Sequence, residues 1–258
     1  MVQPLLRNVS ISLLSHKRPL SGHRNTLVLL CRLSNEADLL EERRPLQLVV
    51  ALDRSGSMGG RKLENAIATL RALIDELGPE DRLGLVAFDD LVEVALRPTL
   101  MNSSSKDLAI SSLRRFSTRG GTDLCGASLA AFSLAREIGP DSHVILLTDG
   151  APTTGITNPG QILRIVSGAI ESLTLSTFGY GQDVHPELLG QMADIGRSNY
   201  HFIDGNEPPR DAFASELGGQ RAIVALDVKL DLLPAKGVKI RSWPLAAQGL
   251  LHGDGSAT

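Results

Sequence analysis

Hydrophobic and polar positions follow two different periods in the middle of the chain. Between residues 46 and 217, short apolar runs alternate with segments in which apolar residues recur every three or four positions. The short runs predict strands that are buried on both faces of a sheet, and the longer segments predict helices with one buried face. Strands and helices that alternate in this way are typical of a mostly parallel sheet with helices on both faces.

The expected strands include one antiparallel neighbour. They lie at residues 46–52, 83–88, 91–96, 144–147, 173–178 and 200–203. Only Asp89 and Asp90 separate the second strand from the third, which is hairpin spacing, so this pair must be antiparallel. Helices are expected at residues 63–77, 103–116, 124–138, 162–170, 186–195 and 210–217.

The two ends of the chain carry a different pattern. Residues 224–232 alternate between apolar and polar, which predicts a strand with one wet face, and further strands are expected at 9–13, 27–33 and 238–243. We therefore expect residues 1–43 and 219–258 to form a small, sandwich-like antiparallel β unit beside an α/β domain of residues 44–218. Because four strands make a thin sheet, we hypothesise that the native protein continues beyond Thr258.

Composition narrows the classes of function. The 258 residues carry a formal net charge of -3 and only 3% aromatic residues, so a nucleic-acid partner is not expected. No apolar run reaches the length of a membrane span, and Met1–Leu14 lacks the features of a signal peptide. Cys31 and Cys125 lie in different predicted domains, which favours free thiols and a cytoplasmic location, although a piece of a longer exported protein would look the same.

Three polar loops are expected at the carboxyl edge of the sheet, where open parallel sheets bind ligands. Asp53–Met58 follows the first buried strand, Gly120–Asp123 opens a helix, and Thr148–Gly150 follows the strand at 144–147. Together the loops offer carboxylate and hydroxyl oxygens, which suit a hard divalent cation such as Mg²⁺. The other interpretation of the first loop, an Asp that caps the next helix, does not account for the two further loops.

The three loops resemble the metal-ion-dependent adhesion site of von Willebrand factor A domains. The resemblance rests on Leu48–Met58, on Gly120-Gly121-Thr122 and on Leu146–Gly150, and residues 178–203 are similar to bacterial members. It covers about residues 45–218. The resemblance implies a three-layer, Rossmann-like fold whose six-stranded sheet has one antiparallel edge strand.

The resemblance also implies which residues hold the metal. Ser55, Ser57 and Thr122 would contact Mg²⁺ directly, or Mn²⁺ or Ca²⁺ in its place, while Asp53 and Asp149 would act largely through water. Two carboxylates balance the charge of the ion and the hydroxyls add none, so the metal stays electrophilic. The Asp or Glu of a protein partner can then complete the coordination, which predicts a non-catalytic protein-binding module.

Two other functions stay open. A Mg²⁺-dependent phosphoryl-transfer enzyme would use Asp53 as its nucleophile, but the haloacid-dehalogenase type expects a second acidic residue where Ser55 stands, and the chain has no Walker loop. A scaffold or self-assembly unit would use the metal only to stabilise its fold.

Further residues beside the loops are candidates for partner contact, each with a simpler alternative. Arg54 can point to solvent, Met58 can pack in the core, and Asp123 can either lie near the metal or stabilise a helix dipole. Gly150 completes the candidate partner contacts. Asp89-Asp90 is interpreted as a turn, with a second metal site as the alternative.

Overall fold

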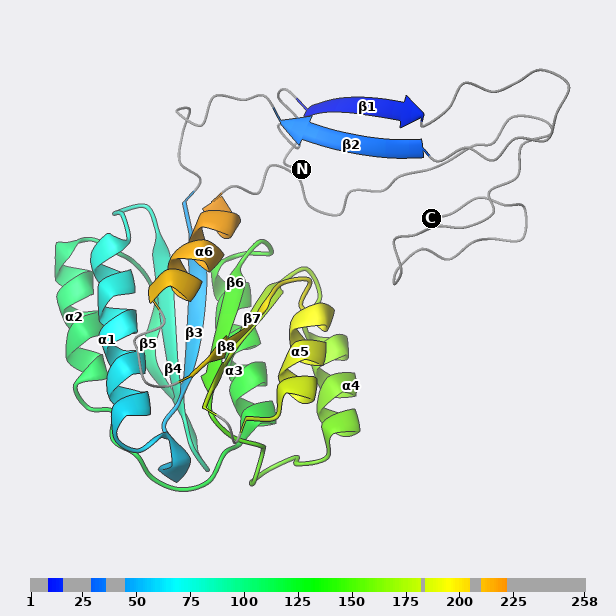
Figure 1. The fold of residues 1–258 in the computed structure, drawn as a ribbon. Helices are drawn as coiled ribbons and strands as arrows, with labels where there is room; N and C mark the ends of the chain where they lie inside the picture. Colours follow the sequence, from blue (N-terminus) through cyan, green and yellow to red (C-terminus); the bar gives the residue numbers. More distant parts are fainter. Residues whose placement is uncertain (1–8, 16–28, 36–44, 182–183, 205–209, 222–258) are drawn as a thin grey trace, which may run out of the picture. The chain divides into compact units, whose positions relative to one another are not determined.

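A computed structural model describes residues 9–15, 29–35, 45–181, 184–204 and 210–221 (Figure 1). The chain divides into two compact units, residues 1–41 with 223–258, and residues 42–222. In the first unit β1 (Val9–Ser15) pairs antiparallel with β2 (Leu29–Asn35), close to the strands expected there. The strands predicted at 224–232 and 238–243 lie outside the described residues, so a β unit built from both chain ends stays a prediction.

The second unit is built on a six-stranded mixed sheet in the order β5-β4-β3-β6-β7-β8. All neighbouring strands are parallel except the edge strand β5, which runs antiparallel to β4. The strands are β3 (Gln47–Asp53), β4 (Arg82–Phe88), β5 (Val92–Leu100), β6 (His143–Thr148), β7 (Thr174–Tyr180) and β8 (Tyr200–Ile203). The predicted sheet with one antiparallel edge is confirmed.

Helices cover both faces of this sheet (Figure 1). They are α1 (Arg61–Glu76), α2 (Ser103–Leu113), α3 (Leu124–Ile138), α4 (Pro159–Ala169), α5 (Pro186–Ile195) and α6 (Arg210–Arg221), with a short 3-10 turn, η1, at Gly56–Met58. A hydrophobic core lies on each face of the sheet, and alternate residues of β3 point into each core. Leu48, Val50 and Leu52 pack with α1 and α6, while Val49 and Ala51 pack with α3. The expected three-layer architecture follows from this alternation.

Some boundaries differ from the pattern-based prediction. The prediction ended the edge strand at residue 96, but β5 continues through Pro98 to Leu100. Proline is tolerated there because β5 has a neighbour on one side only, and the pairing with β4 shifts register between Leu83 and Leu85. Helix α2 ends at Leu113, before the predicted residue 116.

Because β3, β6 and β7 are parallel, their carboxyl ends lie at one edge of the sheet and their amino ends lie at the opposite edge. Leu52 pairs with Leu147, so the ends of β3 and β6 lie side by side at the carboxyl edge. His143 pairs with Thr174, so the first residues of β6 and β7 lie together at the amino edge. None of the helices in the described parts of the chain has the length and apolarity of a membrane span.

Candidate metal centre

Four of the five predicted metal ligands are joined by hydrogen bonds at the carboxyl edge of the sheet. The Ser55 backbone amide donates to Asp53 Oδ1 over 2.7 Å, and Ser55 Oγ lies 3.1 Å from Ser57 Oγ. Ser57 Oγ in turn donates to Asp149 Oδ1 over 2.7 Å. The second oxygen of Asp53 accepts a hydrogen bond of 2.5 Å from Thr148 Oγ1. The loops after β3 and β6 therefore form one cluster of oxygen atoms.

The fifth predicted ligand, Thr122, is brought to this cluster by backbone contacts. The Gly56 amide donates to the Gly120 carbonyl over 3.1 Å, which ties the two loops together. On the other side, the Thr122 amide donates to Thr153 Oγ1 over 2.8 Å, and its carbonyl accepts from the amides of Thr153 and Thr154. Thr122 is buried, with 2% of its surface exposed, so its position is fixed from two directions.

The chemistry of this cluster fits a divalent cation. The pKa of the Asp53 carboxyl is raised to about 6. Burial is the main cause, hydrogen bonds from Thr148 and Ser55 oppose the rise, and the nearby charge of Asp149 adds a little to it. A cation among these oxygens would favour the ionised form of both carboxylates. Two carboxylates and three hydroxyls also make the all-oxygen donor set that hard cations prefer.

Lys62 is a member of the cluster that the sequence analysis missed. Its ammonium, from the first turn of α1, donates to Asp149 Oδ2. The side chain of Lys62 is 24% exposed, whereas that of Asp149 is fully buried. One signal points to it in retrospect: Arg61 and Lys62 open a helix whose dipole favours acidic residues at its start.

The structure gives the candidate partner-contact residues different places. Arg54 does not point to solvent, because its side chain is buried and its Nε donates to Asp89 Oδ2 over 2.7 Å. Met58 is fully buried in the core on the α1 face, which confirms packing and excludes an exposed rim position. Asp123 caps α3 by accepting from the Gly126 amide. Partner contact by Arg54, Asp123 or the half-buried Gly150 stays a prediction.

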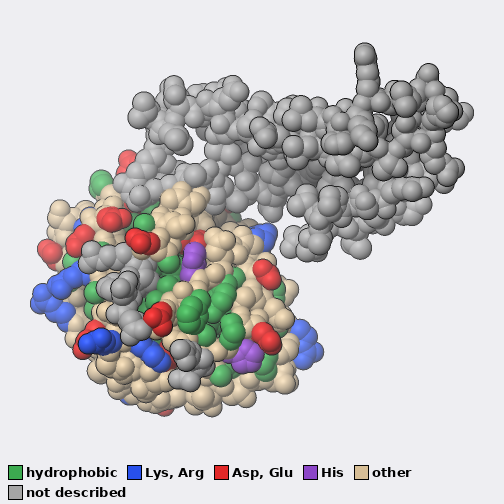
Figure 2. All heavy atoms as spheres, in the orientation of Figure 1, with side chains coloured by type: hydrophobic (Ala, Val, Ile, Leu, Met, Phe, Trp, Pro, Cys, Tyr) green, Lys and Arg blue, Asp and Glu red, His purple; other side chains and the backbone are tan. Residues whose placement is uncertain are grey.

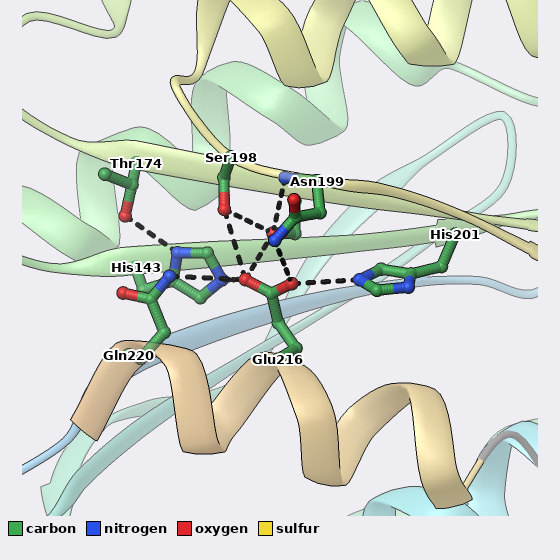
Figure 3. Close-up of polar contacts among 8 residues, drawn as sticks. His143, Thr174, Ser198, Asn199, His201, Glu216 and Gln220 are labelled. Carbon is green, nitrogen blue, oxygen red and sulfur yellow. Dashed lines mark hydrogen bonds and ion pairs between the residues drawn. The ribbon is translucent and has the colours of Figure 1, made fainter. Parts of the chain in front are cut away.

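A second cluster of polar side chains lies at the amino edge of the sheet, around the buried Glu216 of α6 (Figure 3). The Glu216 side chain is 1% exposed. Its Oε1 accepts from Ser176 Oγ over 2.7 Å, and its Oε2 accepts from Asn199 Nδ2 over 3.0 Å. His201 Nε2 lies 2.9 Å from Oε2, and His143 Nε2 lies 3.2 Å from Oε1. The cluster is completed by Ser198 and Gln220.

The sequence analysis did not predict the Glu216 cluster. Burial alone would raise the pKa of Glu216, but the donors led by His143, His201 and Ser176 hold it well below its usual range. Within the described residues, no group of three or more His, Cys, Asp or Glu side chains is arranged to hold a metal. We therefore interpret Glu216 as a hydrogen-bonded buried carboxylate that anchors α6 to the sheet.

Two smaller expectations can be checked. Cys125 is a buried free thiol, as the sequence predicted, and burial raises its pKa. On the face shown in Figure 2, acidic and basic side chains of the described residues are interspersed rather than gathered into one basic surface.

The α/β unit of this chain matches a known protein family. The family model of the von Willebrand factor type A domain matches residues 47–209. Over 160 residues the chain is 34% identical to human inter-alpha-trypsin inhibitor heavy chain H4. That match covers 58% of this chain and 17% of the heavy chain, so the chain spans a small part of this relative.

Solved structures share the fold at low sequence identity. A von Willebrand factor type A protein from Catenulispora acidiphila superposes with a TM-score of 0.63 at 21% identity, covering 84% of this chain and 49% of that one. Proximal thread matrix protein 1 from the mussel byssus, solved with zinc in its metal-ion-dependent adhesion site, gives a TM-score of 0.50 at 18% identity. It covers 65% of this chain and 46% of that one.

Proposed function

The chain belongs to the von Willebrand factor type A domain family, and from this premise we propose that it is a non-catalytic protein-binding module with a divalent metal centre. The observation that carries the proposal is the hydrogen-bonded cluster of Asp53, Ser55, Ser57 and Asp149 at the carboxyl edge of the sheet. Domains of this family are protein-interaction and adhesion modules. The proposal assigns that role to this chain through its own loop residues.

The hydroxyls of Ser55, Ser57 and Thr122 would hold the ion directly, and Asp53 and Asp149 would hold it largely through water. Mg²⁺ is our first choice because the donors are all oxygens, with Mn²⁺ or Ca²⁺ as substitutes. When bound, the ion supplies an electrophilic position that the Asp or Glu side chain of a partner protein can fill.

The environment of Asp53 favours binding over catalysis. Its side chain is fully buried, and its two oxygens accept hydrogen bonds from Ser55 and Thr148. A nucleophilic carboxylate needs an oxygen that is exposed to its substrate, and the Asp53 side chain has no exposed surface. Ser55 also stands where the haloacid-dehalogenase type needs a second acid. A phosphoryl-transfer reaction is therefore the weaker proposal.

Calorimetric titration of the whole chain with MnCl₂ and MgCl₂ tests the metal centre. Wild type should bind one equivalent of metal, and Thr122→Ala should bind more weakly by about tenfold or more, because one direct ligand is lost. Thr99→Ala is the matched control, since Thr99 pairs with Leu83 at the far end of β4 and bonds only to the Arg97 carbonyl. Absence of metal binding by wild type would contradict the proposal.

Partner binding is tested by capture from native extract with Mg²⁺ and again with EDTA. The proposal expects partners that are retained only with Mg²⁺ and only by protein with Asp53 intact. Equal capture by Asp53→Ala would favour the scaffold alternative. Phosphatase activity that disappears in Asp53→Asn would favour the enzyme.

A further inference from the structure

Asp89, which directly follows β4, is a buried carboxylate that binds two arginines from two different loops. Its Oδ2 accepts from Arg54 Nε and from Arg119 Nε, each over 2.7 Å. Its Oδ1 accepts from Arg119 Nη2 over 3.3 Å and from the Leu91 amide over 2.8 Å. Asp89 is fully buried, so this one carboxyl group joins the β4–β5 turn to the two other loops.

Arg54 stands between two of the predicted metal ligands and is held through both its side chain and its backbone. Besides Asp89, its guanidinium donates to Glu93 Oε2 over 2.9 Å. Its backbone amide donates to the Phe88 carbonyl over 2.7 Å, and its carbonyl accepts from the Arg119 amide over 2.9 Å. The path of the first metal loop is thus fixed by β4 on one side and by Arg119 on the other.

Arg119 lies at the start of the loop that carries Thr122, and that loop is held on both sides of Thr122. The Asp123 amide donates to the Asp89 carbonyl over 2.8 Å. Gly120 has a positive φ of 61°, and a side chain there would overlap Asp90, whose Oδ1 would lie 2.0 Å from the added Cβ. The Thr122 loop therefore rests directly on Asp89 and Asp90.

Opposite charges in this group lie close together. Arg54 and Arg119 face Asp89 and Glu93, and the charge of Asp90 also acts on Arg119, so two cations stand among three anions. Burial alone would raise the pKa of Asp89, but hydrogen bonds, led by those from Arg119 and the Leu91 amide, hold it well below its usual range. The carboxylate stays ionised, and the fork of each guanidinium fixes its direction.

We infer that Asp89 is a positioning residue for the metal centre, which acts through Arg54 and Arg119 to set the spacing between the Ser55–Ser57 loop and the Thr122 loop. This inference rests on the proposed function, because the spacing matters only if the two loops share one ion. It also replaces the alternative that Asp89-Asp90 forms a metal site of its own, since Asp89 is occupied by arginines.

Arg119 is the best place to test the inference, because its side chain is 50% exposed and its removal opens little buried space. Mn²⁺ affinity, measured by electron paramagnetic resonance on the whole chain, should fall about tenfold or more in Arg119→Ala. Arg119→Lys keeps the charge but loses the fork, so its affinity should also stay below that of wild type. Arg97→Ala, which removes an exposed ion pair with Glu137, is the matched control and should change affinity by less than about twofold.

The Mn²⁺ titration distinguishes failure of the inference from failure of the proposed function. Unchanged Mn²⁺ affinity in Arg119→Ala and Arg119→Lys, with metal bound by wild type, would overturn the inference and leave the proposed function in place. No binding by wild type would overturn the proposed function itself. Thermal unfolding in EDTA identifies the folded variants, and a purely structural role would leave the affinity of folded protein unchanged. If Arg119→Ala fails to fold, Arg119→Lys carries the decision alone.

Discussion

Buried carboxylates lie at both edges of the same sheet, and the two sites differ in how the negative charge is stabilised. At the amino edge, Glu216 is surrounded by hydroxyl, amide and imidazole donors, and its pKa lies below its usual range. At the carboxyl edge, Asp53 has fewer donors and a second carboxylate, Asp149, nearby, and its pKa rises to about 6. Burial of an acid is common to both, so burial alone does not mark a cation site. We therefore expect the cation at the edge where a second carboxylate, Asp149, acts on the first.

The largest effect is expected from Glu216→Ala. Removal of this carboxylate leaves the buried side chains of His143 and Ser176 without the oxygen that they face, which should lower the free energy of unfolding by about 3 kcal/mol or more. Urea denaturation in EDTA measures it, with the exposed Glu137→Ala as control, expected within about 0.5 kcal/mol of wild type. Mn²⁺ affinity of the folded variant should not change, and a large loss would mean that the two edges are not independent.

Asp53→Asn should act with the opposite sign when metal is removed. A pKa that rises from 3.8 to about 6 means that the ionised carboxyl costs up to about 3 kcal/mol of stability at neutral pH. The amide carries no charge, so Asp53→Asn should be more stable than wild type in EDTA and should no longer gain stability from Mg²⁺. Urea denaturation in both conditions measures this, and a destabilised Asp53→Asn in EDTA would contradict the assigned electrostatics.

The pH dependence of stability should separate the two edges in a single titration. The folded pKa of Asp53 is raised, so in EDTA its stabilising contribution is present below 3.8 and is lost as the pH rises through about 6. The folded pKa of Glu216 is lowered, so its contribution is present above the ordinary value of 4.5 and is lost as the pH falls below that value. Between pH 3.8 and about 6, wild type in EDTA should therefore lose stability relative to Asp53→Asn as the pH rises. Parallel curves for the two proteins would be the contrary result.

The smallest effect is expected at Lys62. Replacement by Met keeps the aliphatic stem but removes the ammonium that contacts Asp149, so stability in EDTA should fall by about 1 kcal/mol. Saturating Mg²⁺ should reduce this difference in stability, because the bound ion would interact with the same Asp149 carboxylate. Lys106→Met serves as control, since its ammonium contacts only the Asp75 carbonyl at the surface. A loss that is unchanged by Mg²⁺ would show that Lys62 acts through packing.

Sequence patterns predicted the parts of this structure whose partners are close in the chain or repeat with a regular period. The strand and helix periods gave the mixed sheet, and the alternate polar residues from Asp53 to Ser57 stood out because they follow a buried strand. The loop of Thr122 stood out less, since it opens a helix and follows no strand, and the resemblance supplied the direct metal contact of Thr122.

The contacts that the sequence analysis missed join residues far apart in the chain. Lys62 lies 87 residues from Asp149, Arg54 lies 35 residues from Asp89, and Glu216 lies 40 residues from Ser176. Pattern analysis treats a polar residue on a helix as solvent-facing, so a buried Glu216 has no local signal. Such contacts follow from tertiary packing, which a single sequence does not display.

The central claim, that one ion joins the Asp53 loop to Thr122, is tested most directly by Mn²⁺ titration of wild type beside Thr122→Ala. The account predicts one bound equivalent in wild type and an affinity lower by about tenfold or more in Thr122→Ala, with both proteins folded in EDTA. Equal affinity in the two proteins would contradict it, because the ion would then be held without the second loop.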